Sequence, residues 1–154
     1  MNPARNKLGF LFFIAIQPNI HSCPESLRSS GTPTTSTTPS GDIALYKQER
    51  VYAILLDGES VLGIEEISRG SGMCVEAQPE RVFRPAIQRR CKSIILVHNH
   101  PSGFAYPSNE DRAVMWKLMS DGSDLGIDVA DSVIVAADGY YSFKEEMERM
   151  LVKG

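Results

Sequence analysis

The segment SIILVHNHPSGFAYPSNED, residues 93–111, decides the interpretation of the chain. In it, an apolar run leads directly into His98, Asn99 and His100. Such a run is typical of a strand in the middle of a sheet, with both faces buried. Successive side chains of a strand point to opposite faces, so His98 and His100 should share one face and Asn99 should occupy the other. We expect this strand to cover residues 92–100.

Two imidazoles at this spacing are suited to hold two corners of a tetrahedral zinc ion. The chain has three histidines in all, and two of them are here. Asp111 is the nearest candidate for a third ligand, because it falls at the third position of a helix that Ser108 is expected to cap. Three protein ligands leave one position for water, which is the arrangement of a catalytic zinc site. Zinc lowers the pKa of such a water, and a nearby carboxylate could act as general base.

The same residues also have interpretations that need no metal. A histidine at the end of a strand can be purely structural. Ser108-x-x-Asp111 is a variant of the capping box, in which each side chain satisfies the backbone of the other residue. Pro101 and Gly103 are common in turns. The residues alone therefore leave a metal site and a helix cap as alternatives.

Hydrophobic patterns elsewhere predict an α/β fold, a three-layer arrangement of a mixed sheet with flanking helices. The expected strands are residues 50–57, 61–68, 131–137 and 140–143, with the first two and the last two each forming a hairpin. The expected helices are residues 79–90, 108–121 and 144–152. We expect Gly122 to end the second helix and Pro85 to kink or shorten the first.

The size and composition of the chain limit its class. At 154 residues, it is long enough for one domain with a core and short for two. Apolar content of 42% and charged content of 23% are those of an ordinary globular protein. A net charge of -3 argues against a nucleic-acid binder that works by neutralising phosphates. Cys23, Cys74 and Cys91 form no C-x-x-C pair and are odd in number, which favours a reducing compartment such as the cytoplasm.

The first 41 residues differ in composition from the rest. Residues 8–16, LGFLFFIAI, follow Arg5 and Lys7 in the order of a secretory signal, but no small-x-small cleavage site comes after them. This stretch is also too short to span a bilayer. Residues 29–40, SSGTPTTSTTPS, have the composition of a linker. We expect an N-terminal segment at 1–41, disordered in part, and one domain at 42–154 with no membrane span.

The segment HNHPSGFAYPSNED, residues 98–111, resembles the zinc-binding signature of the JAMM (MPN-plus, or JAB) metalloprotease domains, His-x-His-Pro followed by Ser-x-x-Asp. The form His-Asn-His-Pro-Ser-Gly is more similar to the bacterial RadC branch of that family. The likeness extends over the expected domain. It includes LLDGESVLGIEEISRG at 55–70, ERVFRPAIQRRCKSIILVHNHPSG at 80–103 and DVADSVIVAADGYYSF at 128–143. The resemblance implies the JAMM fold, which is similar to that of cytidine deaminases.

The resemblance also implies roles for individual residues. His98, His100 and Asp111 match the zinc ligands, and Ser108 matches a serine whose hydroxyl stabilises the oxyanion. The catalytic glutamate of the family lies at the start of the first strand, which corresponds to Glu49. The implied activity is zinc-dependent hydrolysis of a peptide or isopeptide bond, with a peptide or protein as substrate.

Glu65 and Glu66 are rivals of Glu49 for the general base. They are adjacent in a strand, so one of them must face inward or into a cleft. The position of the glutamate in the family favours Glu49 over both.

The chain departs from the RadC pattern at two positions outside the metal set. Ser132 follows Asp131 where RadC-like sequences usually carry a histidine, and Pro85 interrupts a helix that is normally free of proline. These departures concern substrate handling or local geometry rather than zinc binding.

Three other functions compete with hydrolysis. The RadC branch is associated with DNA repair, and the basic residues Arg81, Arg84, Arg89 and Arg90 could contact nucleic acid, although a solvated helix face explains them as well. A non-catalytic MPN interaction module is the second. Nucleobase deamination is the third, and it is disfavoured because the His-x-Glu and Pro-Cys-x-x-Cys motifs are absent. The sequence does not specify the oligomeric state.

Overall fold

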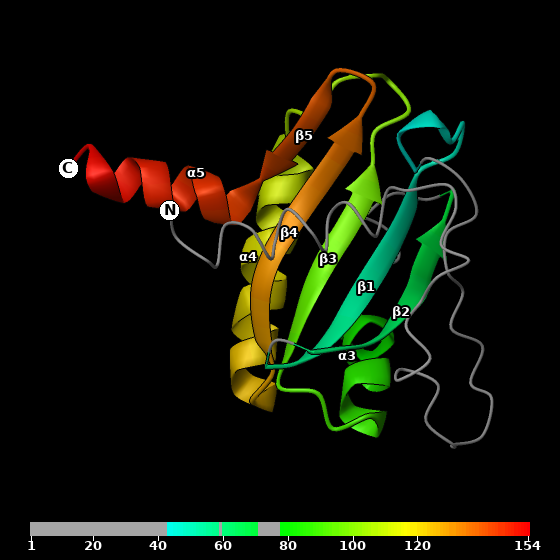
Figure 1. Ribbon diagram of the computed structural model, residues 1–154, viewed down its shortest axis with the longest axis vertical. Coiled ribbons are helices and arrows are strands. Elements are labelled where there is room, and N and C mark those ends of the chain that lie inside the picture. The colour runs from blue at the N-terminus through cyan, green and yellow to red at the C-terminus, as the bar shows by residue number, and fades with distance from the viewer. Residues whose placement is uncertain (1–42, 59, 71–77) are drawn as a thin grey trace.

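The computed structural model describes residues 43–58, 60–70 and 78–154. The predictions for residues 1–41, including the apolar stretch and the linker, lie outside the described residues. So do Cys23 and Cys74. In chain order the elements are the 3-10 helix η2 (Ile43–Leu45), β1 (Arg50–Asp57), β2 (Ser60–Arg69), α3 (Pro79–Gln88), β3 (Ser93–Asn99), α4 (Asn109–Leu125), β4 (Asp128–Ala136), β5 (Gly139–Ser142) and α5 (Phe143–Val152) (Figure 1).

The strands form one mixed sheet in the order β2-β1-β3-β4-β5. β1 is antiparallel to β2 and to β3, β3 is parallel to β4, and β4 is antiparallel to β5. α4 connects the parallel strands β3 and β4, because parallel neighbours need a long crossover connection, which is usually a helix. β3 is central, as its apolar sequence predicts, and its residues from Ile94 to Asn99 are all buried. The predicted α/β class with a mixed sheet and flanking helices is confirmed.

Helices α3 and α4 cover one face of the sheet (Figure 1). The helices contribute buried side chains that pack there against every second residue of the strands. From α3 these are Val82, Phe83 and Ala86, and from α4 they are Met115 and Leu118. Those strand residues are Val51, Ala53, Leu55, Ile94, Leu96, Val129, Ile134 and Ala136. Ala44 of η2 packs against a second apolar cluster, which comprises Ile54, Leu56, Ile95, Val97, Val133 and Val135. His98 and His100 follow Leu96 at two-residue intervals along β3, so their side chains lie on the same face of the sheet as Leu96, which is the face that α4 covers.

The predicted end of the second helix is wrong. α4 continues through Gly122 to Leu125, and Gly126 ends it with a left-handed φ of 71°. Gly122 is buried where α4 passes close to the Phe83 ring and the Ile127 carbonyl oxygen, so a β-carbon there would collide with the carbonyl oxygen and crowd the ring. Gly122 is therefore needed for packing, and Gly126 supplies the left-handed conformation that commonly ends a helix.

The remaining boundaries differ by a few residues. α3 continues past Pro85 and ends at Gln88, two residues before the expected end at Arg90. β4 begins at Asp128, three residues before the predicted start. α5 leads away from the sheet after β5 (Figure 1), and Met150, Leu151 and Val152 near its end are exposed. In the described part of the chain, no helix has the length and hydropathy to cross a membrane.

Candidate metal centre

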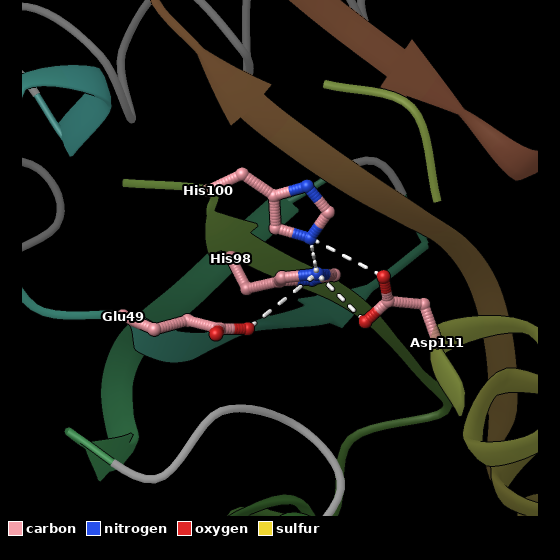
Figure 2. Close-up of side chains that lie close together, drawn as sticks. All are labelled: Glu49, His98, His100 and Asp111. Carbon is pink, nitrogen blue, oxygen red and sulfur yellow. Dashed lines mark hydrogen bonds and ion pairs between the residues drawn. The ribbon is translucent and has the colours of Figure 1, made fainter. Parts of the chain in front are cut away.

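Four potential ligands converge at one end of β3. Glu49, His98, His100 and Asp111 each place a nitrogen or oxygen atom within 4.8 Å of the corresponding atoms of the other three (Figure 2). The residues come from three parts of the chain: the segment before β1, the end of β3 and the first turn of α4, which follows β3 directly in the element order. Figure 2 shows Glu49 and Asp111 approaching His98 from opposite sides. The group could hold a metal ion.

The two histidines project from the same face of β3, as their spacing predicts. Their Nε2 atoms are 3.2 Å apart, and their rings meet edge to face. His98 is completely buried, whereas the His100 side chain retains 15% exposure. The backbone N–H of His100 donates to the Val135 carbonyl, 2.9 Å away, and this bond continues the pairing with β4 past the end of β3. The site therefore lies on a backbone fixed by the sheet.

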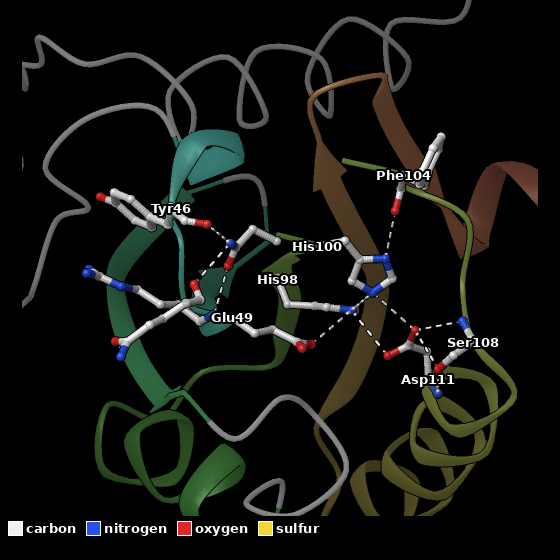
Figure 3. Close-up of polar contacts among 10 residues, drawn as sticks. Tyr46, Glu49, His98, His100, Phe104, Ser108 and Asp111 are labelled. Carbon is white, nitrogen blue, oxygen red and sulfur yellow. Dashed lines mark hydrogen bonds and ion pairs between the residues drawn. The ribbon is translucent and has the colours of Figure 1, made fainter. Parts of the chain in front are cut away.

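Asp111 faces both histidines from the start of α4. Its Oδ1 is 3.3 Å from His98 Nε2, and its Oδ2 is 3.2 Å from His100 Nε2. The same carboxyl group accepts hydrogen bonds from the backbone N–H and the hydroxyl of Ser108, while the Ser108 hydroxyl accepts the Asp111 N–H (Figure 3). The capping box and the contact with the histidines thus coexist in one residue.

Glu49 reaches the site because of the register between β1 and β3. In this antiparallel pair Val51 is opposite His98. Two residues earlier, Glu49 lies on the same face as Val51 and beside the end of β3. Its Oε1 is 4.0 Å from His98 Nε2, and 27% of its side chain is exposed.

The two rival glutamates are engaged elsewhere. Glu65 forms a 2.7 Å ion pair with Arg89. Glu66 accepts hydrogen bonds from Arg69 and from the Tyr52 hydroxyl. Among the three candidates, the structure places only Glu49 beside the histidines.

Charge interactions shift the protonation of two site residues. Burial alone would raise the pKa of Asp111, but hydrogen bonds from His100 and His98 outweigh burial and hold that pKa well below its ordinary value. The pKa of His100 is raised, first by its hydrogen bond to Asp111 and also by the Phe104 carbonyl, against the opposing effect of burial. Asp111 is therefore an anion at neutral pH, as a metal-ligating carboxylate must be.

The ring of His100 is oriented for ligation through Nε2. Its Nδ1 is 2.9 Å from the Phe104 carbonyl oxygen, so Nδ1 carries the proton and donates it there (Figure 3). A carbonyl partner of this kind is the usual companion of a metal-bound histidine, because it keeps a proton on Nδ1, so that Nε2 is the nitrogen that would give up its proton and bind a metal. Within the described residues, His98 Nδ1 is buried without a hydrogen-bond partner.

Of the four basic residues at 81–90, Arg89 is engaged with the sheet. Arg89 donates to the Leu62 carbonyl and pairs with Glu65, which ties it to β2. Arg81, Arg84 and Arg90 are exposed. One member of the basic cluster seen in the sequence therefore connects the end of α3 to β2.

Comparison with known proteins agrees with this geometry. Residues 33–149 match the model of the RadC-like JAB domain. The chain is 40% identical over 98 residues to a UPF0758 protein of Symbiobacterium thermophilum, covering 63% of this chain and 42% of that protein. It is 39% identical over 108 residues to a UPF0758 protein of Thermotoga maritima, covering 70% and 49%. A UPF0758 protein of Alkaliphilus metalliredigens is 45% identical over 102 residues, covering 66% and 44%. The chain thus spans less than half the length of these relatives, and its matched part, with the site in it, belongs to the RadC-like JAB domain family.

Proposed function

We propose that this domain is a zinc-dependent metallohydrolase that cleaves a peptide or isopeptide bond. The observation that carries the proposal is the convergence of Glu49 with His98, His100 and Asp111 at one end of β3. Three groups would serve as protein ligands, and a separate carboxylate at the rim would serve as base. This division of labour is that of catalytic rather than structural zinc sites.

The spacing of the donor atoms supports zinc as the metal. Ligand atoms about 2.0–2.1 Å from a tetrahedral zinc ion lie roughly 3.3 Å from one another. The two imidazole Nε2 atoms are 3.2 Å apart, and each lies close to a different oxygen of Asp111: His98 Nε2 is 3.3 Å from Oδ1 and His100 Nε2 is 3.2 Å from Oδ2. Two imidazoles and one carboxylate are also ligand types that zinc accepts. His98 and His100 would bind through Nε2, and Asp111 through a carboxylate oxygen.

When bound, zinc supplies Lewis acidity, which polarises a carbonyl group and makes water acidic enough to attack near neutral pH. Glu49 would accept the proton of the attacking water at Oε1 and deliver it to the leaving amine. Its partial exposure leaves room for water and substrate beside it.

Ser108 would donate a hydrogen bond to the oxyanion that forms on the substrate. Its hydroxyl donates to Asp111 Oδ2 in this structure. The proposed role therefore requires the hydroxyl to turn toward the substrate, while the Ser108 backbone N–H continues to bond Asp111.

The exchange of Glu49 for glutamine tests the proposal. Glu49→Gln should retain zinc and lose hydrolysis by about 10²–10⁴-fold, because the amide cannot accept the proton. Glu65→Gln is the matched control, since Glu65 pairs with Arg89 away from the site. The assay is a screen of peptides and lysine-branched isopeptides with zinc-loaded protein. Full hydrolytic activity in Glu49→Gln would contradict the assignment.

A peptide or protein substrate is part of the proposal, and nucleic-acid binding is the alternative. A DNA-binding role would show as an affinity that falls with added salt and with removal of Arg81 and Arg84. The pairing of Arg89 with Glu65 does not favour it. A non-catalytic interaction module would be indicated by protein that takes up no zinc at neutral pH.

A further inference from the structure

Asn99, between the two histidines, has a side chain that leaves β3 by the face opposite theirs. It is fully buried. Its Nδ2 donates to the carbonyl oxygens of Tyr46 and Gln48, at 3.2 and 3.1 Å, and its Oδ1 accepts the backbone N–H of Arg50 at 2.7 Å. These bonds attach to the peptide groups on both sides of Glu49. We propose that Asn99 is the positioning residue that holds Glu49 at the metal centre.

The bonding pattern explains why the residue is an asparagine. The segment presents two carbonyl oxygens and one N–H to the same side chain. Only a carboxamide offers two N–H donors and an acceptor together at this length. A carboxylate could accept from Arg50 but would turn an acceptor toward two carbonyls, and an aliphatic side chain would leave all three groups unsatisfied.

Glu49 depends on this support because it lies outside the strand. β1 begins at Arg50, and its pairing with β3 begins at Val51, so Glu49 is not part of the backbone pairing between these two strands. On the other side, the Glu49 carbonyl accepts the N–H of Gly70, 2.7 Å away. Asn99 and Gly70 therefore hold the same peptide segment from opposite sides. Figure 3 shows Tyr46 and Glu49 on this segment, beside the end of β3.

One short strand thus serves two purposes with alternate residues. His98 and His100 supply two of the candidate metal ligands, and Asn99 fixes the segment that carries the Glu49 carboxylate. A misplacement of a catalytic group by about 1 Å can cost a factor of 100 in rate. Loss of Asn99 should therefore reduce turnover without removing any metal ligand. This step rests on the proposed function, whereas the structural support of Glu49 does not.

Two substitutions and one control test the inference. Asn99→Leu removes every hydrogen bond to the segment, and Asn99→Asp keeps only the acceptor for Arg50. Val97→Ala is the control, because Val97 lies two residues earlier on the same face of β3 and packs in the apolar cluster there. It should weaken the same part of the fold without releasing the segment. All proteins are loaded with zinc and compared for zinc content, amide hydrogen exchange at Arg50, and kcat and KM on a substrate from the screen.

We expect parent-like zinc content in all three variants. Exchange of the Arg50 amide should accelerate at least tenfold in Asn99→Leu, and less in Asn99→Asp and Val97→Ala. In both Asn99 variants kcat should fall by tenfold or more, while KM stays within threefold of the parent value. In Val97→Ala, kcat should stay at the parent value. Parent-like kcat in both Asn99 variants, or parent-like exchange at Arg50 in Asn99→Leu, would overturn the inference. If Asn99→Leu does not fold, Asn99→Asp decides by its zinc content and kcat.

Failure of the proposed function would be recognised separately. If the zinc-loaded parent cleaves nothing, a crystal structure of the zinc-loaded Asn99→Asp variant decides the positioning alone. A Glu49 carboxylate displaced from its place beside His98 supports the inference, and an unmoved carboxylate overturns it.

Discussion

Asp111 Oδ2 accepts the Ser108 backbone N–H at 2.8 Å and lies 3.2 Å from His100 Nε2. One carboxylate oxygen thus joins the start of α4 to the end of β3. The capping function and the ligand function, which are alternatives in the sequence, are compatible in space. The cap orients the carboxyl group, and the histidines lie in the direction it faces.

Substitution of Asp111 should separate these two functions. Asp111→Ala removes both, so we expect zinc affinity to fall on the order of 100-fold or more and the free energy of unfolding of zinc-free protein to drop by about 1–2 kcal/mol. Asp111→Asn keeps an oxygen for the Ser108 N–H. It should lose zinc affinity while retaining most of the zinc-free stability. Urea unfolding in chelator and zinc titration measure the two quantities, and equal loss of stability in both variants would argue against the cap.

Ser108→Ala should leave the ligands in place. Loss of the hydroxyl removes the acceptor for the Asp111 N–H, and we expect a decrease of about 1 kcal/mol in the free energy of unfolding. Zinc content should stay at the parent level. If the hydroxyl also stabilises the oxyanion, kcat should fall by about 10²-fold or more. Ser108→Thr is the control, because threonine keeps a hydroxyl at the cap.

Gly122→Ala should destabilise the domain although alanine favours helices. On an open helix surface this change would stabilise by about 1 kcal/mol. Here the new β-carbon would lie 3.2 Å from the Phe83 ring and would also collide with the Ile127 carbonyl, so we expect a net loss of about 1–3 kcal/mol. Ser120→Ala, exposed on the same helix, should be neutral or stabilising. Unfolding curves of the two variants provide the comparison.

The stability that Glu66 contributes should disappear in acid. Burial would raise its pKa, but hydrogen bonds from Arg69 and Tyr52 outweigh burial and lower the pKa below the ordinary 4.5. The folded protein therefore binds fewer protons than the unfolded chain, and the contribution is present above pH 4.5 and lost as the pH falls through the lowered pKa. Glu66→Gln should cost up to about 1 kcal/mol at pH 7 and progressively less below pH 4.5. A cost independent of pH would contradict this; Glu148→Gln, exposed on α5, is the control.

The local parts of the candidate site could be predicted from the sequence. Strand alternation places His98 and His100 on one face, and the capping pattern places Asp111 in the first turn of α4. These placements depend only on neighbours in the chain. The α/β class can be predicted in the same way, because segments with strand-like and helix-like hydrophobic patterns alternate along the chain.

Long-range contacts could not be predicted from the residues alone. Glu49 is brought to His98 by the register of β1 on β3, which its own apolar neighbours do not specify. Among Glu49, Glu65 and Glu66, the hydrophobic pattern therefore favours none, and only the family resemblance points to Glu49. The sequence pattern predicts a helix end at Gly122 because glycine is a poor helix former, whereas the structure shows that a glycine is needed there by its close approach to the Ile127 carbonyl oxygen and the Phe83 ring. The hydrogen bonds of Asn99 had no signal in the sequence apart from its position between the histidines.

Metal content is the most direct test of the central claim. Protein purified without a His-tag, together with His100→Ala, would be analysed by plasma mass spectrometry after equilibration with zinc at neutral pH. The account predicts near-stoichiometric zinc in the parent and little in the variant. An absence of zinc from the parent would contradict the account and leave Asp111 as a helix cap alone.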